Sequence, residues 1–96
     1  MGYVVIARWL AREGEEQSVR AALEQLAGPS LAEPGCRFYQ PAVDARNPRL
    51  FMLVEVYSNE AAYQQHLQSD HFVRFAVERA IPLLERRDRE FYETLI

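Results

Sequence analysis

The sequence contains no lysine, and all eleven of its basic residues are arginine. Schiff-base chemistry and lysine general bases are therefore excluded as mechanisms. The chain has only one cysteine, Cys36, so no disulfide can form within it. A single free thiol is typical of proteins kept in a reducing compartment, and we expect a cytoplasmic location.

Long apolar runs, glycine-rich loops and basic patches are also missing. No apolar stretch approaches the roughly 20 residues that span a bilayer, so we expect no membrane partner. The four glycines are scattered, which leaves no phosphate-binding loop for a nucleotide or a flavin. The net charge is −3 with both signs interspersed, so nucleic acid is not an expected partner. The N-terminal residues match neither a signal peptide nor a myristoylation sequence.

What is present indicates one folded domain, residues 1–96. The chain is too short for a second core, and 49% hydrophobic with 26% charged residues is an ordinary globular composition. Apolar runs rich in valine and aromatic residues predict four strands. They lie at residues 3–10, 36–43, 50–57 and in the C-terminal stretch FYETLI.

Two helices are predicted between these strands. The first begins near Glu15 and is kinked or ended by the Gly-Pro pair at 28–29. The second begins after a cap at residue 58 or 59 and is split before a further cap at Ser69. The resulting order, β-α-β-β-α-β, is that of a ferredoxin-like α+β fold with an antiparallel sheet and a split second helix.

Both faces of the first and third predicted strands are apolar, although the helices of this fold cover only one face of the sheet. A small domain with such a second face usually buries it against a partner. We therefore expect a homodimer whose two sheets pack face to face.

Two histidines on the split helix are candidates for acid–base chemistry. His66 lies beside Tyr63 at i and i+3, and could act as a general base in a pocket between sheet and helices. A structural bond to a carbonyl or to Glu55 is the alternative. His71 lies in the first turn of the second half, where the dipole disfavours an imidazolium. A neutral ring there could accept a substrate proton or only order the helix start.

Glu55 is a lone carboxylate in a very apolar strand, and an unpaired buried carboxylate is costly. Its partner could be His66 or a substrate hydroxyl, which would place it in the site. It could equally be Arg8, Arg37 or Arg89 on a neighbouring strand or subunit. The structural ion pair is the favoured interpretation, because pairing is the usual fate of a buried charge.

Several aromatic residues surround these groups in the predicted fold. Each of them alone is more often plain core than ligand contact, but together they suit a flat aromatic ligand. The walls are assigned to Trp9, Phe51 and Phe72, and the hydroxyl donors to Tyr57 and Tyr63.

Two segments, EPGCRFYQP at 33–41 and LVEVYSNEAAYQQHLQSDHF at 53–72, resemble the antibiotic biosynthesis monooxygenase family of small ferredoxin-like proteins. The shared pattern is E-P-G-C, then E-x-[WY], then H-L-x-S-x-H-F, in order and at the right separations. The resemblance covers nearly the whole chain. It implies a dimeric α+β barrel in which the C-terminal strand reaches across to the partner.

The resemblance also implies an oxygenase that uses no metal, haem or flavin. Its substrates would be O₂ and an electron-rich hydroxylated aromatic, such as a quinol or an anthrone, which reduces O₂ once deprotonated. In this interpretation His66 is the base, the two tyrosines stabilise the phenolate, and Arg74 or Arg79 helps to hold an anion. A small hydroxyketone isomerase of the same family, and a non-catalytic dimer that binds a hydrophobic ligand, are the alternatives.

The chain departs from some branches of this family. Polyketide-tailoring members place an asparagine, a tryptophan and a tyrosine around their substrate, and Leu53, Tyr57 and Tyr63 stand at those positions here. The first strand lacks the asparagine that haem-degrading members need, so haem degradation is not expected. Two histidines and a carboxylate could form an iron triad. Since a predicted helix break separates His66 from His71, no metal site is predicted.

Overall fold

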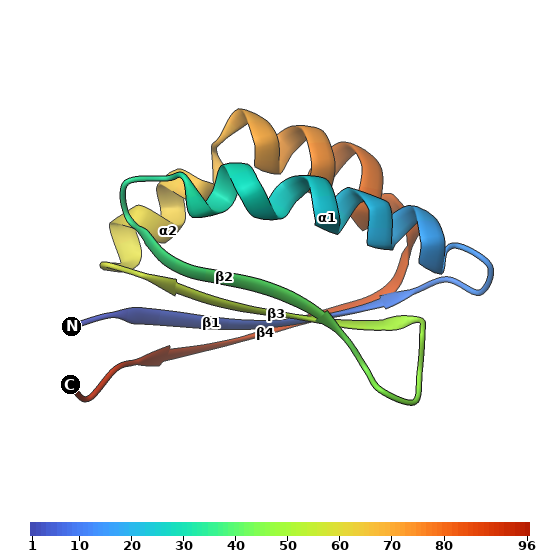
Figure 1. Ribbon diagram of the computed structural model, residues 1–96, viewed down its shortest axis with the longest axis horizontal. Helices are drawn as coiled ribbons and strands as arrows, with labels where there is room; N and C mark the ends of the chain where they lie inside the picture. Colours follow the sequence, from blue (N-terminus) through green and yellow to red (C-terminus); the bar gives the residue numbers. More distant parts are fainter.

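The computed structural model describes residues 1–96, and it has the ferredoxin-like order expected from the sequence. Helices lie on one face of a single sheet, and both chain termini emerge at the same end (Figure 1). In chain order the elements are β1 (Tyr3–Ala11), α1 (Glu16–Leu31), β2 (Cys36–Val43), β3 (Leu50–Tyr57), α2 (Glu60–Leu67), the π-helix η1 (Phe72–Ala80), the short 3₁₀ turn η2 (Ile81–Leu83) and β4 (Leu84–Glu93). None of the helices is long and apolar enough to cross a membrane.

The four strands form one antiparallel sheet in the order β2-β3-β1-β4. Strand β1 lies between β3 and β4, and its Val5 pairs with Glu55 of β3 on one side and with Phe91 of β4 on the other. Because side chains alternate across a sheet, this register places Val5, Glu55 and Phe91 on the same face. That face is covered by the helices, so Glu55 points into the protein rather than out of it.

The core fills the space between this inner face and the helices. The odd-numbered residues of β1 and β3 supply it, together with one stripe from each helix. Its buried members include Ala7, Trp9, Leu23, Leu26, Phe51, Leu53, Phe72, Ala76 and Ala80.

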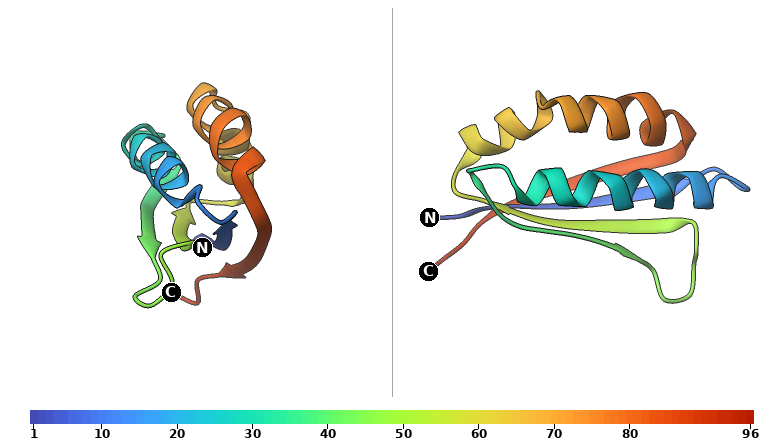
Figure 2. Two further views of the ribbon diagram at one scale, coloured as in Figure 1. Left: turned by 90° about the vertical axis from the view of Figure 1, so that its right-hand side faces the viewer. Right: turned by 45° about the horizontal axis from the view of Figure 1, so that its top comes forward.

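The outer face of the sheet has no covering layer within the chain, as the end-on view in Figure 2 shows. It carries the even-numbered residues of the central strands, such as Ile6 and Val54, which pair directly and are only partly buried. Phe38 of β2 is 46% exposed on the same face. Arg8 and Glu90 cross this surface in an exposed ion pair of 2.7 Å.

The split of the second helix is confirmed, and its two caps are visible. The Asn59 side chain accepts a hydrogen bond from the Ala62 N–H at 2.9 Å and begins α2. Ser69 Oγ accepts from the Phe72 N–H at 3.2 Å and begins the second half. That half is wound as a π-helix, a wider form often found at functional sites.

Two predicted boundaries differ from the structure. Helix α1 continues through Pro29 to Leu31, because only the last turn is affected and the Ala32 N–H still reaches Gly28 O at 3.1 Å. Strand β4 begins at Leu84 and ends at Glu93, so it contains the charged stretch that the sequence analysis left outside the strand. An edge strand pairs through its backbone and tolerates exposed charges, which explains the difference.

Candidate active site

A small cavity lies beneath the split helix, between α2, η1 and the strands β1, β3 and β4. Its enclosed volume is about 10 Å³, which is room for roughly one water molecule. The lining residues come from all of these elements and combine aromatic, acidic and basic groups. They are Ala7, Trp9, Glu55, Tyr63, His66, Leu67, Phe72, Arg87 and Arg89.

His66 is the most enclosed polar group of this cavity, with 1% of its surface exposed. Its Nδ1 lies 2.7 Å from Oε2 of Glu33. Because a carboxylate only accepts hydrogen bonds, Nδ1 carries the proton and Nε2 keeps its lone pair. Nε2 lies 3.9 Å from Oε1 of Glu55, so the unprotonated nitrogen is on the side of the ring that meets the cavity wall.

Burial lowers the pKa of His66, and the hydrogen bond and charge of Glu33 oppose that decrease. The ring is therefore neutral at pH 7, which a general base must be before it can accept a proton. A carboxylate behind an imidazole is the arrangement that fixes the tautomer and supports the imidazolium once it forms. The Glu33–His66 pair has this geometry.

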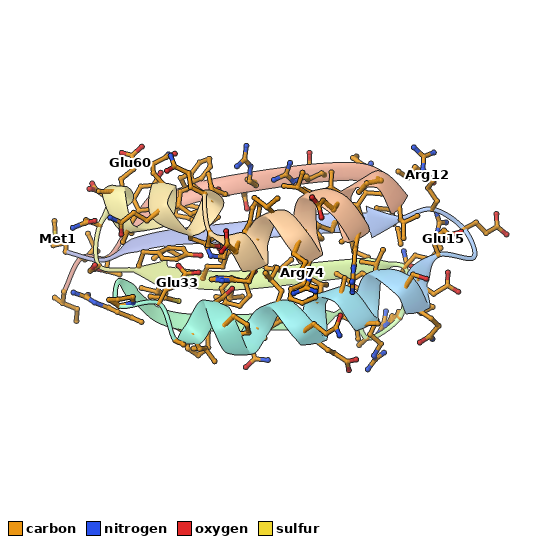
Figure 3. All side chains as sticks on the ribbon, turned by 90° about the horizontal axis from the view of Figure 1, so that it is seen from above. Met1, Arg12, Glu15, Glu33, Glu60 and Arg74 are labelled. Atoms are coloured by element: carbon orange, nitrogen blue, oxygen red, sulfur yellow. The ribbon has the colours of Figure 1, made fainter.

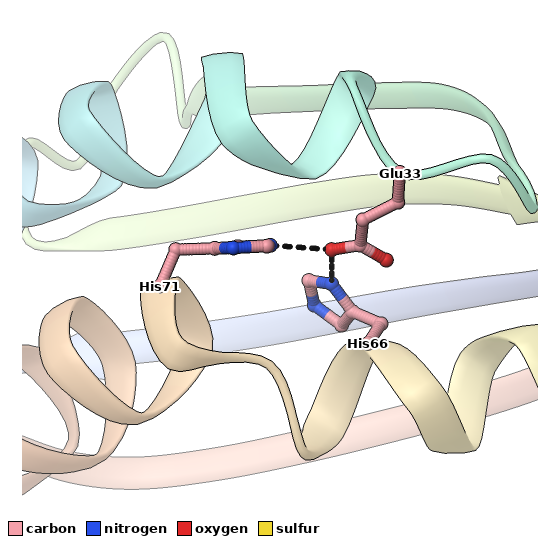
Figure 4. A group of neighbouring side chains, drawn as sticks. All are labelled: Glu33, His66 and His71. Atoms are coloured by element: carbon pink, nitrogen blue, oxygen red, sulfur yellow. Dashed lines mark hydrogen bonds and ion pairs between the residues drawn. The ribbon is translucent and has the colours of Figure 1, made fainter.

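Glu33 itself lies in the turn between α1 and β2, facing the split helix (Figure 3). The same Oε2 atom is 2.5 Å from Nε2 of His71, so one carboxylate oxygen connects the two histidines (Figure 4). Gly35, two residues further on, lies so close to α2 that an added Cβ would be 2.5 Å from the Cβ of Ala62. Only glycine allows this approach, which brings Glu33 within reach of both rings.

Glu55 is 5% exposed, and its partner is a tyrosine rather than an arginine. Tyr57 donates its hydroxyl to Oε1 of Glu55 at 2.5 Å. Burial raises the pKa of Glu55 to about 7, and the Tyr57 hydrogen bond opposes that increase. Within the chain the predicted structural ion pair does not form, because no guanidinium lies within 4.0 Å of this carboxyl group. Arg8 cannot be the partner of Glu55, because its position on β1 places it on the outer face of the sheet.

Tyr63 accepts a hydrogen bond from Nη1 of Arg89 at 2.8 Å. Since its oxygen already accepts, its own hydroxyl proton is available to a group in the cavity. Burial raises the pKa of Tyr63, whereas Arg89 lowers it, so the phenol stays protonated near neutral pH and can donate. The donor role of Tyr63 toward a substrate stays a prediction.

The remaining wall is aromatic. Phe72 meets the ring of His66 edge-on with centroids 5.1 Å apart, and Tyr57 and Tyr39 flank the same ring at 5.4 Å. Trp9 is 2% exposed, and its indole N–H has no acceptor within the chain. An apolar enclosure of this kind strengthens every polar interaction made inside it.

Five of the predicted site residues line the cavity together: Trp9, Glu55, Tyr63, His66 and Phe72. Tyr57 and His71 lie directly behind Glu55 and Glu33, so they hold those carboxyl groups instead of lining the wall. The structure does not bring Phe51 or Arg74 to the cavity. Phe51 lines a separate hollow with Leu23 and Val43, and exposed Arg74 lies over the Phe75 ring.

Three residues of the site were not predicted: Glu33, Arg87 and Arg89. Glu33 belongs to the E-P-G-C motif, but its contact with His66 spans 33 positions and depends on the turn after α1. The two arginines are at alternate positions of β4, which puts both on the inner face. The sequence analysis did not assign this charged stretch to the strand, so the alternation went unnoticed.

Glu33, His66 and His71 are also the donor set of an iron triad, with ligand atoms within 4.8 Å of one another. In this arrangement both ring nitrogens that face Glu33 are at hydrogen-bond distance from a single oxygen. Each nitrogen needs a proton to make that bond and a lone pair to bind a metal. The observed geometry therefore fits a hydrogen-bonded triad, and a metal could bind only by displacing both bonds.

Comparison with known families gives an independent result. The family model described as "Antibiotic biosynthesis monooxygenase" matches residues 2–78. The Mycobacterium tuberculosis protein named "Putative monooxygenase Rv0793" is 34% identical over 71 residues, which are 74% of this chain and 69% of that protein. The Synechocystis protein named "Uncharacterized protein sll1783" is 32% identical over 84 residues, which are 86% of this chain but only 56% of that protein.

Solved structures confirm the fold. The crystal structure of PA3566 from Pseudomonas aeruginosa superposes with a TM-score of 0.91 at 28% identity, over 99% of this chain and 95% of that one. The structure of Rv0793 superposes with a TM-score of 0.90 at 28% identity, over 100% and 97% of the two chains. The resemblance stated from the two sequence segments is confirmed by these matches.

Proposed function

This chain belongs to the antibiotic biosynthesis monooxygenase family, and from that membership we propose that it is a monooxygenase that needs no metal, haem or flavin. Its proposed substrates are O₂ and a hydroxylated aromatic of the quinol or anthrone class. The observation that carries the proposal is the Glu33–His66 pair, which presents an unprotonated Nε2 at the wall of an aromatic cavity.

In the proposed reaction, Nε2 of His66 takes the proton of a ring hydroxyl, and the resulting anion is the electron donor to O₂. Glu33 stabilises the imidazolium that forms. Tyr63, polarised by Arg89, donates to the substrate oxyanion. The substrate supplies all four electrons: one oxygen atom ends on its carbon and the other leaves as water, so no external reductant is required.

We also propose that the working form is a homodimer. The support is the outer face of the sheet, where apolar residues such as Ile6, Val54 and Phe38 remain partly exposed with no layer over them. Exposed apolar patches of this kind mark protein–protein contacts. In this arrangement the two sheets pack together and the cavities remain on opposite sides, beneath the helices.

Glu55 favours a second candidate, the isomerisation of a small hydroxyketone. Its pKa of about 7 lets it give or take a proton near neutral pH, and it lies 3.9 Å from Nε2 of His66. Isomerisation of a hydroxyketone moves one proton between two carbons and another between two oxygens, and two acid–base groups can share these transfers. The cavity holds such a pair, and isomerase activity would proceed without O₂.

An oxygen electrode tests the main proposal. The purified protein should accelerate O₂ uptake by a menadiol-like quinol or an anthrone, and chelators should not slow it. Loss of uptake on chelation, restored by iron, would instead assign Glu33, His66 and His71 to a metal site. Binding of aromatic ligands without any O₂ uptake would make the protein a binding protein.

A further inference from the structure

Two arginines of the cavity have no acidic partner. Arg87 and Arg89 pair with Trp9 and Ala7 of β1, so both point to the helix side and line the cavity. Neither has a carboxylate within ion-pair distance. Arg89 donates to Tyr63, and the guanidinium of Arg87 lies 5.9 Å from the centre of the Trp9 ring.

The charges of the cavity do not balance. Glu55 is its one acidic residue, with a pKa of about 7, so near neutral pH it is only partly ionised. Two guanidinium groups therefore face at most one carboxylate. Burial lowers the pKa of Arg87, and the nearby charge of Arg89 lowers it further.

Hydrogen-bond donors also outnumber acceptors. The available donors are the two guanidinium groups, the Tyr63 hydroxyl and the Trp9 indole N–H, which is buried without an acceptor in the chain. The acceptors are Nε2 of His66 and the Glu55 carboxyl group. The indole N–H of Trp9 and the hydroxyl of Tyr63 are buried donors, which normally have partners, and the exposed guanidinium groups of Arg87 and Arg89 add positive charge beside them. The ligand that suits this wall is therefore rich in acceptors and negatively charged.

We propose that the cavity selects a hydroxylated aromatic acid, with its carboxylate on Arg87 and Arg89 and its ring hydroxyl facing His66. This inference rests on the proposed function and names the substrate class of the same site. A carboxylate fits because a guanidinium binds it through two parallel hydrogen bonds. The enclosed volume is only about 10 Å³, so binding of a ring requires the exposed side chains of Arg87 and Arg89 to move outward.

The test uses a matched ligand pair, 4-hydroxybenzoate and its neutral amide, with the protein as purified. Trp9 is the only tryptophan, so its indole N–H gives one resolved NMR signal inside the cavity. The acid should shift that signal and bind more tightly than the amide by on the order of tenfold or more. Arg87→Gln should reduce this preference to nearly equal binding.

Arg86→Gln is the control, because Arg86 faces away from the cavity and pairs with Asp88, and it should keep the preference for the acid. Equal binding of acid and amide, no binding of either, or an unchanged preference in Arg87→Gln would each overturn the inference. Since no turnover is measured, a protein that selects the acid but consumes no O₂ with any quinol keeps this inference and loses the proposed function. A protein that oxidises quinols without preferring the acid keeps the proposed function and loses this inference.

Discussion

Glu55 is the residue whose environment the sequence described least well. Its strand looked apolar enough to require a compensating arginine, but the structure supplies a tyrosine hydroxyl and enclosure by aromatic rings. Burial raises its pKa from 4.5 to about 7, so the folded protein holds a proton that the unfolded chain releases between those values. Stability therefore decreases as the pH rises from about 4.5 to about 7.

This predicts that Glu55→Gln stabilises the protein at pH 8, where the wild-type carboxylate is buried and charged. The gain should be about 1–3 kcal/mol, and it should vanish near pH 4.5. Thermal melts at the two pH values measure it, with the exposed Glu13→Gln as a control that changes neither. A lower Tm for Glu55→Gln at pH 8 would restore the ion-pair interpretation.

The pair of Glu33 and His66 gives a second prediction at the residue scale. Glu33→Gln keeps an acceptor for Nδ1 but removes the charge that raises the pKa of His66. The turnover rate should decrease, and the acid limb of its pH profile should move to lower pH. Glu33→Asp keeps the charge, so it should partly restore both the turnover rate and the position of the acid limb. A decrease in rate with an unmoved pH profile would show that Glu33 does not act through His66.

Single residues could be predicted only where local sequence determines them. His66 and Tyr63 were predicted because they share one helix face, and Trp9 and Phe72 because aromatic residues gather around a pocket. Glu33 could not be placed, since its contact with His66 depends on how the turn after α1 packs on α2.

At the scale of elements, the turn that contains Gly35 positions the site. Gly35→Ala should push α2 away, because the new methyl group would meet Ala62. Overpacking of this kind costs about 1–3 kcal/mol, which for a domain of this size lowers the Tm by several degrees. Turnover should fall as well, because the Glu33–His66 bond lengthens.

Gly28→Ala is the matched control, since nothing lies within 4 Å of its added methyl group. Gly35→Ala should have a lower Tm and a lower turnover rate than Gly28→Ala. Equal behaviour of both would mean that the close approach of Gly35 to α2 does not determine the geometry of the site.

Elements were predictable where the pattern is strong. The strands β2 and β3 begin and end where the apolar runs do, and the break at Ser69 follows from its cap. The start of β4 was missed because an edge strand needs no apolar pattern. The continuation of α1 was missed because a proline in the last turn removes little of the hydrogen bonding of the helix.

At the scale of the whole molecule, the outer face of the sheet predicts a dimer. Light scattering should give twice the chain mass. Val54→Asp, at the centre of that face, should reduce it to the mass of one chain, because a charge would be buried between the sheets. Val77→Asp, on the exposed side of η1, should remain dimeric. A wild-type monomer at micromolar concentration would refute the dimer.

The overall fold followed from the order of elements, whereas the position of the site within it required the three-dimensional structure. Glu33, His66, Glu55 and Arg89 come from four different segments, and only their packing creates a base, a donor and a positively charged wall around one cavity. The central claim is that Nε2 of His66 removes the substrate proton before O₂ reacts.

The direct measurement of that claim is an anaerobic titration of the protein with a quinol, followed by absorbance, because the quinol anion absorbs at longer wavelength than the neutral form. Wild-type protein should bind the quinol as its anion. His66→Ala should stay folded, bind the neutral form, and lose about 10²- to 10⁴-fold in rate when O₂ is admitted. Formation of the anion to the same extent in His66→Ala would contradict the account.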